Sequence, residues 1–303
     1  MKMIVTGGAG FIGSHLVDTL INNGIEVHVI DSLSTGKLSN LNPKATWYPF
    51  EINSPEARNV IKTIKPDAVF HLAAQADVSR SIINPLEDLH INVYGTVNLL
   101  QGCVEASVRK FIFSSTSAVY GNIERDLITE QEPTNPSSFY GLSKLTAEHY
   151  IQLYSKLYRL PYAILRYANV YGPRQLPKGD GGVIAVFLKR LKNGEPIFIH
   201  GDGTQTRDFI FVKDVVDANL AAFEHANNQT FHISTGESIS INELLDHIEN
   251  FHEQPISKQF KPPRIGDIQH SCLANELAKE HLQWQPSVYI EEGLSYAYYQ
   301  EHR

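Results

Sequence analysis

The chain has 303 residues, of which 42% are hydrophobic and 19% are charged, and its net charge is −7. This composition is typical of a globular enzyme with one large domain or two closely packed ones, and it offers no basic surface that would favour nucleic acid as a partner. The two cysteines, Cys103 and Cys272, form no C-x-x-C pattern and the histidines show no ligand spacing, so neither a disulfide framework nor a metal site is expected.

The first residues have the pattern of a short strand that enters a glycine loop, and they do not resemble a signal peptide. No apolar run of about 18 residues is present, so the sequence predicts no membrane span and no membrane partner. Unpaired cysteines fit a reducing compartment. We therefore expect a cytoplasmic protein.

Short apolar runs alternate with amphipathic runs in the first half of the chain. The expected strands, in chain order, are 3–5, 27–30, 68–72, 110–114 and 163–167. The expected helices between and after them are 12–21, 56–64, 91–105 and 140–158. Buried strands that alternate with helices indicate a parallel sheet covered on both faces, which is the doubly wound α/β fold of the Rossmann type.

The second half of the chain has a different pattern. Long loops containing glycine and proline, at 171–182, 201–207 and 262–267, separate shorter elements. We therefore expect a smaller, mixed α/β substrate domain after the first one. The predicted division assigns 1–168 to the doubly wound domain, with 208–235 returning to it, and 169–207 together with 236–303 to the smaller domain.

A glycine-rich loop joins the first expected strand to the first expected helix. Gly7, Gly10 and Gly13 have the spacing G-x-x-G-x-x-G. Glycine at such positions permits a tight turn and a close approach of the backbone to a pyrophosphate, and the helix N-terminus presents its unpaired N–H groups to the phosphates. The loop therefore predicts a dinucleotide site.

The second expected strand ends at Asp31, 18 residues after Gly13. A carboxylate at this place can accept hydrogen bonds from both hydroxyls of the adenosine ribose and would repel a 2′-phosphate, so NAD is favoured over NADP. The alternative is an aspartate that merely caps a turn.

A general base is predicted at Tyr140, which precedes Lys144 in the spacing Y-x-x-x-K. In a chain with 14 tyrosines this spacing alone is weak, but Ser138 is a candidate N-cap and the two residues would share one helix face. A neighbouring ammonium and a positive nicotinamide would lower the pKa of Tyr140 from about 10 toward neutrality. The phenol would then work as a general base.

Hydroxyl side chains follow the expected strand at 110–114, in the segment 114–121. Ligands of open α/β sheets bind at the carboxyl ends of the strands. A serine or threonine there could hydrogen-bond the reacting hydroxyl beside the tyrosine. The alternative is a serine- and threonine-rich turn.

With the segments 71–75 and 165–175 and with Asn92, these motifs resemble the extended short-chain dehydrogenase/reductases and, more narrowly, the UDP-hexose 4-epimerases. The resemblance extends from Met3 to about Gly293. It implies catalytic roles for Thr116, Tyr140 and Lys144. The implied NAD-binding residues are Gly7, Gly10, Phe11, Ile12, Gly13, Asp31, Glu51, Ile52, Ala73, Ala74, Asn92, Ser114, Tyr140 and Lys144. The implied substrate-binding residues are Thr116, Asn169, Arg207, Arg264, Asp267 and Ser271.

The arginines suit a diphosphate because a guanidinium offers a fixed fork of donors, although a single arginine can equally form a surface ion pair. Two positions depart from the family pattern. Glu51 stands where members commonly carry aspartate near the adenine, and Ala168 stands where an aromatic residue is usual.

The resemblance also bears on the reaction. Related 4,6-dehydratases carry an acidic pair after the catalytic threonine, whereas this chain has Ser117 and Ala118, and the glutamate usual in decarboxylases is missing as well. Uronate 4-epimerases tend to carry a basic residue where this chain has Leu176. The remaining expectation is 4-epimerisation of a UDP-sugar through a transient 4-keto sugar, with NAD as a tightly held cofactor. The alternative is a uronate 4-epimerase or another member of the family that modifies nucleotide sugars.

In the family, a position shortly after the Arg264 motif distinguishes N-acetylated sugars from plain hexoses. Ser271 occupies it and Cys272 follows, and both are small, so UDP-GlcNAc and UDP-GalNAc are the expected substrates, besides UDP-Glc and UDP-Gal. The resemblance further implies a homodimer formed through two helices. A rival hypothesis is an NAD-binding regulator without turnover, which the presence of both Tyr140 and Lys144 disfavours.

Overall fold

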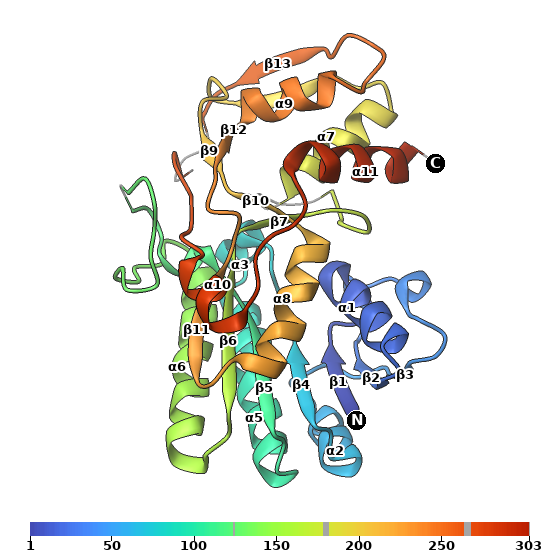
Figure 1. Ribbon diagram of the computed structural model, residues 1–303, viewed down its shortest axis with the longest axis vertical. Helices are drawn as coiled ribbons and strands as arrows, with labels where there is room; N and C mark the ends of the chain where they lie inside the picture. The colour runs from blue at the N-terminus through green and yellow to red at the C-terminus, as the bar shows by residue number, and fades with distance from the viewer. Residues whose placement is uncertain (124, 178–181, 264–267, 303) are drawn as a thin grey trace.

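The computed structural model describes residues 1–123, 125–177, 182–263 and 268–302. The chain forms a large lobe built on a sheet, which contains the N-terminus, and a smaller lobe stacked at one end of that sheet, which contains the last helix (Figure 1). None of the helices in the described ranges has the length and apolar character needed to span a membrane.

Within the described residues, seven parallel strands form the sheet of the large lobe in the order β3-β2-β1-β4-β5-β6-β11. The strands are β1 (Lys2–Thr6), β2 (Glu26–Ile30), β3 (Thr46–Tyr48), β4 (Ala68–His71), β5 (Lys110–Thr116), β6 (Tyr162–Tyr167) and β11 (Gln229–Ile233). The order reverses between β1 and β4, and ligands of doubly wound sheets bind at such a point, beside the carboxyl ends of the strands. The predicted doubly wound class is confirmed.

Helices cover both faces of this sheet, and the buried apolar residues form one cluster on each face. One face packs against α1 (Phe11–Asn22), α8 (Val212–His225) and α10 (Glu276–Leu282). The other face packs against α2 (Pro55–Ile64), α5 (Gly95–Glu105) and α6 (Phe139–Tyr158). Because both faces are covered, the strands are apolar on both sides, which is why they were recognisable as continuous apolar runs.

The segment expected as one helix over 91–105 is interrupted. After α3 (Val78–Ile83) and α4 (Pro85–Leu89), residues His90–Tyr94 form a π-helical turn, and α5 starts only at Gly95. The hydroxyl of Thr96 donates a hydrogen bond to the carbonyl oxygen of Asn92 at 2.6 Å, so a side chain competes for a backbone acceptor at the interruption. Such π turns are frequent at functional sites.

The smaller lobe has its own apolar core. Its elements are α7 (Val183–Lys192), β8 (Ile197–His200), α9 (Ile241–Glu249), β13 (Lys258–Lys261) and α11 (Ile290–His302). Two short ladders lie between the lobes, namely β7 (Asn169–Tyr171) with β10 (Phe209–Phe211) and β9 (Thr206–Arg207) with β12 (Ile239–Ser240). Short 3-10 turns are η1 (Leu38–Asn40) and η3 (Ser117–Val119).

The chain crosses between the lobes more than once. From β6 it enters the ladder at β7, and after β10 it returns to the large lobe through α8 and β11. The strand at the start of the returning segment, β10, pairs with β7 and not with the main sheet. The candidate site lies where these crossings meet the carboxyl ends of β1, β4, β5 and β6.

Candidate active site

The glycine loop has the geometry that a pyrophosphate cradle requires. Gly7 has a positive φ of 71°, and a Cβ atom on it would lie 2.8 Å from the backbone nitrogen of Ala73. A Cβ atom on Gly13 would lie 2.2 Å from the carbonyl oxygen of Gly7. The N-cap of α1 is Gly10, which provides no side-chain cap, so the first-turn N–H groups that include those of Phe11 and Ile12 remain available to an anion.

The carboxylate of Asp31 is tied to the glycine loop. Its Oδ2 accepts a hydrogen bond from the Ala9 nitrogen at 2.9 Å, and its Oδ1 accepts one from the Leu33 nitrogen at 2.8 Å. Each carboxylate oxygen has a second acceptor site, so Asp31 could still accept hydrogen bonds from ribose hydroxyls. Glu51 is exposed, whereas Ile52 is buried against Gly95 in the core of α2 and α5.

A chain of hydrogen bonds connects the segment after β4 to the π turn. The Ala73 nitrogen donates to Oγ1 of Thr6 at 3.2 Å, and Thr6 in turn contacts Nδ1 of His71 at 2.8 Å. Nε2 of His71 contacts Oγ1 of Thr96 at 2.9 Å, and Thr96 donates to the Asn92 carbonyl oxygen. Because Thr96 uses its proton there, His71 must donate through Nε2, which fixes the neutral tautomer. Burial lowers the pKa of His71 well below its usual value.

Ala73 and Ala74 therefore begin a segment that is fixed in place directly after β4. The buried Asn92 holds the end of this segment, because its Oδ1 accepts a hydrogen bond from the Gln75 nitrogen and its Nδ2 donates to the Gln75 carbonyl oxygen, both at 2.9 Å. The predicted cofactor residues Ala73 and Ala74, which follow β4, thus lie in a segment that is joined to Asn92 of the π turn.

The three predicted catalytic residues meet at the ends of β5 and α6. Thr116 is the last residue of β5, and Tyr140 and Lys144 lie one turn apart in α6, which Ser138 caps as predicted. The hydroxyl group of Thr116 lies near enough to that of Tyr140 to lower the pKa of Tyr140. Lys144 is 3% exposed, and its Nζ lies 4.0 Å from the centre of the Phe113 ring.

A pKa of Tyr140 near neutrality remains a prediction, because it depends on a bound nicotinamide as well as on Lys144. Burial raises the pKa of Tyr140 to about 12, while the neighbouring Thr116 hydroxyl acts to lower it. Burial also lowers the pKa of Lys144 to about 7, against the charges of Glu148 and Asp88. Burial therefore opposes the charged forms of both residues.

The predicted substrate residues lie on the short ladders. Asn169 starts β7, and its nitrogen donates to the Asp208 carbonyl oxygen at 2.9 Å; Arg207 precedes that aspartate in β9. Ser271 is 7% exposed, and its carbonyl oxygen accepts a hydrogen bond from the Asp208 nitrogen at 2.9 Å. The backbone of Asp208 therefore joins all three. Arg264 and Asp267 lie outside the described residues.

The side chain of Asp208 was not singled out from the sequence, and it organises this wall. It is 1% exposed and accepts hydrogen bonds from the nitrogens of Thr235 and Gly236, at 2.9 and 3.2 Å, and from the nitrogen of Leu273 at 3.4 Å. Burial raises the pKa of Asp208 to about 6, which these donors oppose. An aspartate next to a candidate phosphate-binding arginine was the signal that could have identified it.

Sequence reasoning also missed two acidic residues around Lys144. Glu148, one turn along α6, forms a buried ion pair with Arg166 at 2.6 Å and accepts a hydrogen bond from Ser115. Asp88, on α4, is 1% exposed. Glu148 could have been identified because it lies four residues after Lys144, on the same face of the helix. Asp88 resembles an ordinary acidic residue in the first turn of a helix. Ser114, which was predicted, lies near enough to the Tyr167 hydroxyl to lower the pKa of Tyr167, against the burial that raises it.

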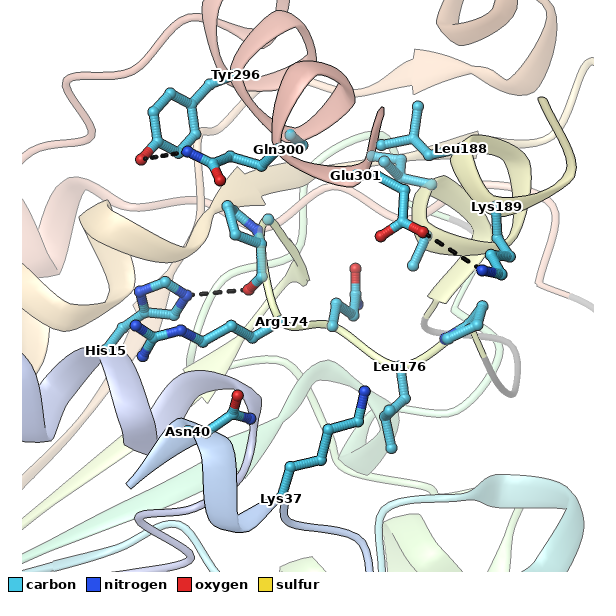
Figure 2. A pocket seen from close by; sticks show the side chains of 17 residues that line it. His15, Lys37, Asn40, Arg174, Leu176, Leu188, Lys189, Tyr296, Gln300 and Glu301 are labelled. Carbon is cyan, nitrogen blue, oxygen red and sulfur yellow. Dashed lines mark hydrogen bonds and ion pairs between the residues drawn. The ribbon is translucent and has the colours of Figure 1, made fainter. Parts of the chain in front are cut away.

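Figure 2 shows a separate cavity, which has a volume of about 600 Å³ and lies between α1, α7 and α11. His15, Arg174 and Leu176 line it together with residues of α7 and α11. Two of its basic side chains have partners, since Arg174 pairs with Asp18 at 2.8 Å and Nε2 of His15 contacts the Pro173 carbonyl oxygen at 3.0 Å. None of the predicted catalytic or binding residues lines this cavity.

Comparisons with known proteins agree with the geometry of the site. The model of the NAD dependent epimerase/dehydratase family matches residues 3–234. A UDP-glucose 4-epimerase of Mycolicibacterium smegmatis is 41% identical over 302 residues, which are 97% of this chain and 96% of the relative.

Solved structures are similar over nearly the whole chain. The UDP-glucose 4-epimerase of Thermotoga maritima, solved with UDP-glucose, is 44% identical with a TM-score of 0.95, covering 99% of this chain and 98% of its own. The UDP-N-acetylglucosamine 4-epimerase of Methanobrevibacter ruminantium, solved with UDP-N-acetylmuramic acid, is 36% identical with a TM-score of 0.93, covering 99% and 97%. The chain therefore belongs to the NAD-dependent epimerase/dehydratase family, as an epimerase of the extended short-chain dehydrogenase/reductase type with NAD as its cofactor.

Proposed function

We propose that the protein interconverts the two C4 epimers of a UDP-sugar through a transient 4-keto sugar. The observation that carries this proposal is that the Thr116 hydroxyl, at the carboxyl end of β5, lies near enough to the Tyr140 hydroxyl to lower its pKa, with Lys144 one helical turn away. A phenol and a hydroxyl placed together can exchange the proton of a sugar hydroxyl. The chain lacks an acidic residue at Ser117 and Ala118, so no group follows Thr116 that could protonate a leaving hydroxyl.

The residues divide the work as follows. The loop of Gly7, Gly10 and Gly13 holds the pyrophosphate of NAD, and Asp31 receives the adenosine ribose. Bound NAD supplies the acceptor and donor of the hydride. Tyr140 takes the proton from the 4-hydroxyl and later returns it, and Thr116 orients that hydroxyl. The ammonium of Lys144 and the positive nicotinamide favour the phenolate, against the burial that raises the pKa of Tyr140.

On the substrate side, we propose that Arg207 and Arg264 bind the diphosphate and that Asn169, Asp267 and Ser271 contact the sugar nucleotide. Arginine suits this task because its guanidinium can bind phosphate oxygens with two parallel hydrogen bonds. Ser271 and Cys272 are small, and we propose that they leave room for a 2-acetamido group. The substrates would then be UDP-GlcNAc and UDP-GalNAc, with UDP-Glc and UDP-Gal also converted.

The sequence disfavoured a uronate substrate through Leu176, which stands where a basic residue would meet a carboxylate. In the structure Leu176 lines the cavity of Figure 2, whose lining includes neither Thr116 nor Tyr140. UDP-glucuronate is therefore included in the test as a third substrate.

The experiment incubates the purified protein with NAD and, separately, with UDP-GlcNAc, UDP-Glc and UDP-glucuronate, and follows the anomeric proton signals by NMR. Appearance of UDP-GalNAc is the expected result, with a second product from UDP-Glc. Conversion of UDP-Glc without UDP-GlcNAc would keep the reaction and contradict the pocket. Conversion of the uronate alone would replace the proposed substrates, and no conversion of any of the three would overturn the epimerase proposal for UDP-sugars.

We also propose a homodimer in the cytoplasm. An exposed apolar stripe runs along α6 at Leu142, Leu153 and Leu157, which are 49%, 49% and 61% exposed, beside the exposed Tyr94 of the π turn. Contiguous exposed apolar surface of this kind marks protein interfaces. Light scattering after size-exclusion chromatography should give twice the chain mass, and the double change Leu153→Glu and Leu157→Glu should give the monomer, whereas Tyr289→Glu, an exposed aromatic elsewhere, should not.

A further inference from the structure

A second carboxylate lies inside the catalytic region without a full set of partners. Asp88 is 1% exposed, and its Oδ1 accepts hydrogen bonds from Nε2 of Gln75 at 3.0 Å and from Nδ2 of Asn92 at 3.1 Å. Its Oδ2 is also buried and has no hydrogen-bond partner among the described residues. A buried carboxylate oxygen without a hydrogen-bond partner is unfavourable, so its presence calls for an explanation.

Polar contacts connect Asp88 to the first turn of the catalytic helix. Nδ2 of Asn92 contacts both Asp88 and Oγ of Ser143, the latter at 3.0 Å. Oγ of Ser143 donates to the carbonyl oxygen of Tyr140 at 3.0 Å. Asp88 is thus joined through Asn92 and Ser143 to the turn of α6 that bears Tyr140 and Lys144.

The charges on the elements packed against α4 are mostly compensated. On α3, Arg80 forms an ion pair with Glu87, and Asp77 caps the helix by accepting from the Arg80 nitrogen. On the π turn, His90 stacks on Tyr94 with ring centres 5.0 Å apart. These groups therefore have partners of their own on the outer side of α4.

On α6, the charge of Asp88 acts on Tyr140 and Lys144, and the charge of Glu148 acts on Lys144. Glu148 is neutralised by Arg166 at 2.6 Å. Asp88 is thus the carboxylate beside Lys144 that no arginine among the described residues neutralises. Its negative charge raises the pKa of both Lys144 and Tyr140.

We propose that Asp88 is a positioning residue whose negative charge keeps the Tyr140–Lys144 pair protonated to higher pH, so that Lys144 remains an ammonium ion while Tyr140 exchanges a proton with the sugar. A nearby negative charge disfavours the loss of either proton, and two interacting groups titrate as a pair. The inference rests on the roles proposed for Tyr140 and Lys144. The hydrogen bonds of Oδ1 hold Asp88 in place, and the proposed role of its charge is to act on Tyr140 and Lys144.

The test compares Asp88→Asn with the wild type and with Asp88→Glu, which keeps the charge. A matched control is Asp214→Asn on α8, because Asp214 is also 1% exposed and accepts hydrogen bonds from Ser287 and Val288. The ultraviolet absorbance of tyrosinate is titrated with pH in each enzyme–NAD complex. The spectrum of the same variant carrying Tyr140→Phe is subtracted, so that the difference reports Tyr140 alone.

In Asp88→Asn, the midpoint of the Tyr140 titration should fall by about one pH unit, and the basic limb of the profile of kcat/KM against pH should move the same way. Asp88→Glu and Asp214→Asn should titrate like the wild type. Equal midpoints in Asp88→Asn and in the wild type would overturn the proposal. If Asp88→Asn does not fold, Asp88→Ser provides a second uncharged variant with an acceptor for Asn92.

The absorbance titration needs no sugar, so its result is independent of the substrate. A lowered midpoint in a protein that converts none of the UDP-sugars would keep the role of Asp88 and reject the proposed reaction. Conversion of a UDP-sugar with an unchanged Tyr140 midpoint in Asp88→Asn would support the proposed reaction and reject the role of Asp88.

Discussion

The two walls of the candidate site are built differently. The reaction wall carries Thr116, Tyr140 and Lys144 on β5 and on the 20-residue helix α6, with buried polar contacts behind them. The substrate wall carries Asn169 and Arg207 on strands of three and two residues. The proposed chemistry thus lies on long packed elements, whereas the proposed substrate recognition depends on short ladders held by one buried aspartate, Asp208.

The strongest test of the reaction wall is Tyr140→Phe. The change removes the hydroxyl that exchanges the proton and leaves the ring, so kcat should fall by about 10²–10⁴-fold with little change in KM. Steady-state rates with the sugar identified by NMR measure this effect. Tyr158→Phe, at the exposed end of the same helix, is the control and should retain full activity. A loss of less than tenfold in Tyr140→Phe would mean that the phenol is not the general base.

A second prediction separates function from stability on the same wall. The pKa of Lys144 falls from 10.5 to about 7 on folding, so the folded state disfavours its proton. The resulting destabilisation is fully present below pH 7 and disappears as the pH rises from 7 to 10.5. Lys144→Met should therefore abolish activity yet raise the free energy of unfolding at pH 7 by about 2 kcal/mol.

Urea denaturation at pH 7 and at pH 10 measures this difference, which should shrink at the higher pH. Lys110→Met is the matched control, because Nζ of Lys110 donates to three carbonyl oxygens at the end of α8, including Ala226 at 2.7 Å. That change should destabilise the protein. A destabilised Lys144→Met variant would show that the lysine contributes more by packing than its burial costs.

On the substrate wall, Arg207→Lys should have a smaller effect of a different kind. Lysine keeps the charge but loses the fork of donors, so KM for the UDP-sugar should rise about tenfold while kcat changes little. Arg190→Lys is the control, because Arg190 pairs with Glu195 on the outer side of α7. A fall in kcat with unchanged KM would place Arg207 in the reaction wall, and the contrast between the walls would be lost.

The same contrast explains what could be predicted from sequence. The strands, the glycine loop and the pair Tyr140 and Lys144 depend on local periodicity and spacing, so they were recognisable. The short strand β3 and the π turn were missed, since three residues give no period and the turn depends on the contact of Thr96 with Asn92. Roles of individual site residues remain predictions.

Contacts between distant residues could not be predicted. Glu148 meets Arg166 across 18 positions, and Asp208 meets Leu273 across 65. Charge and burial of these groups depend on the packing of several elements, and so does the burial that raises the pKa of Tyr140. Sequence spacing therefore predicts which residues react, but not the charges that surround them.

The smallest expected effect concerns the choice of sugar. Ser271→Tyr would place a bulky ring where a 2-acetamido group is proposed to sit, so kcat/KM for UDP-GlcNAc should fall about tenfold while that for UDP-Glc stays within a factor of about three. Ser271→Ala is the control and should convert both sugars as the wild type does. Because Ser271 is 7% exposed and its carbonyl oxygen bonds to Asp208, a tyrosine that disturbed the wall would lower both values together. Equal losses would thus mark Ser271 as part of the support for Asp208 and move the choice of sugar to another part of the wall.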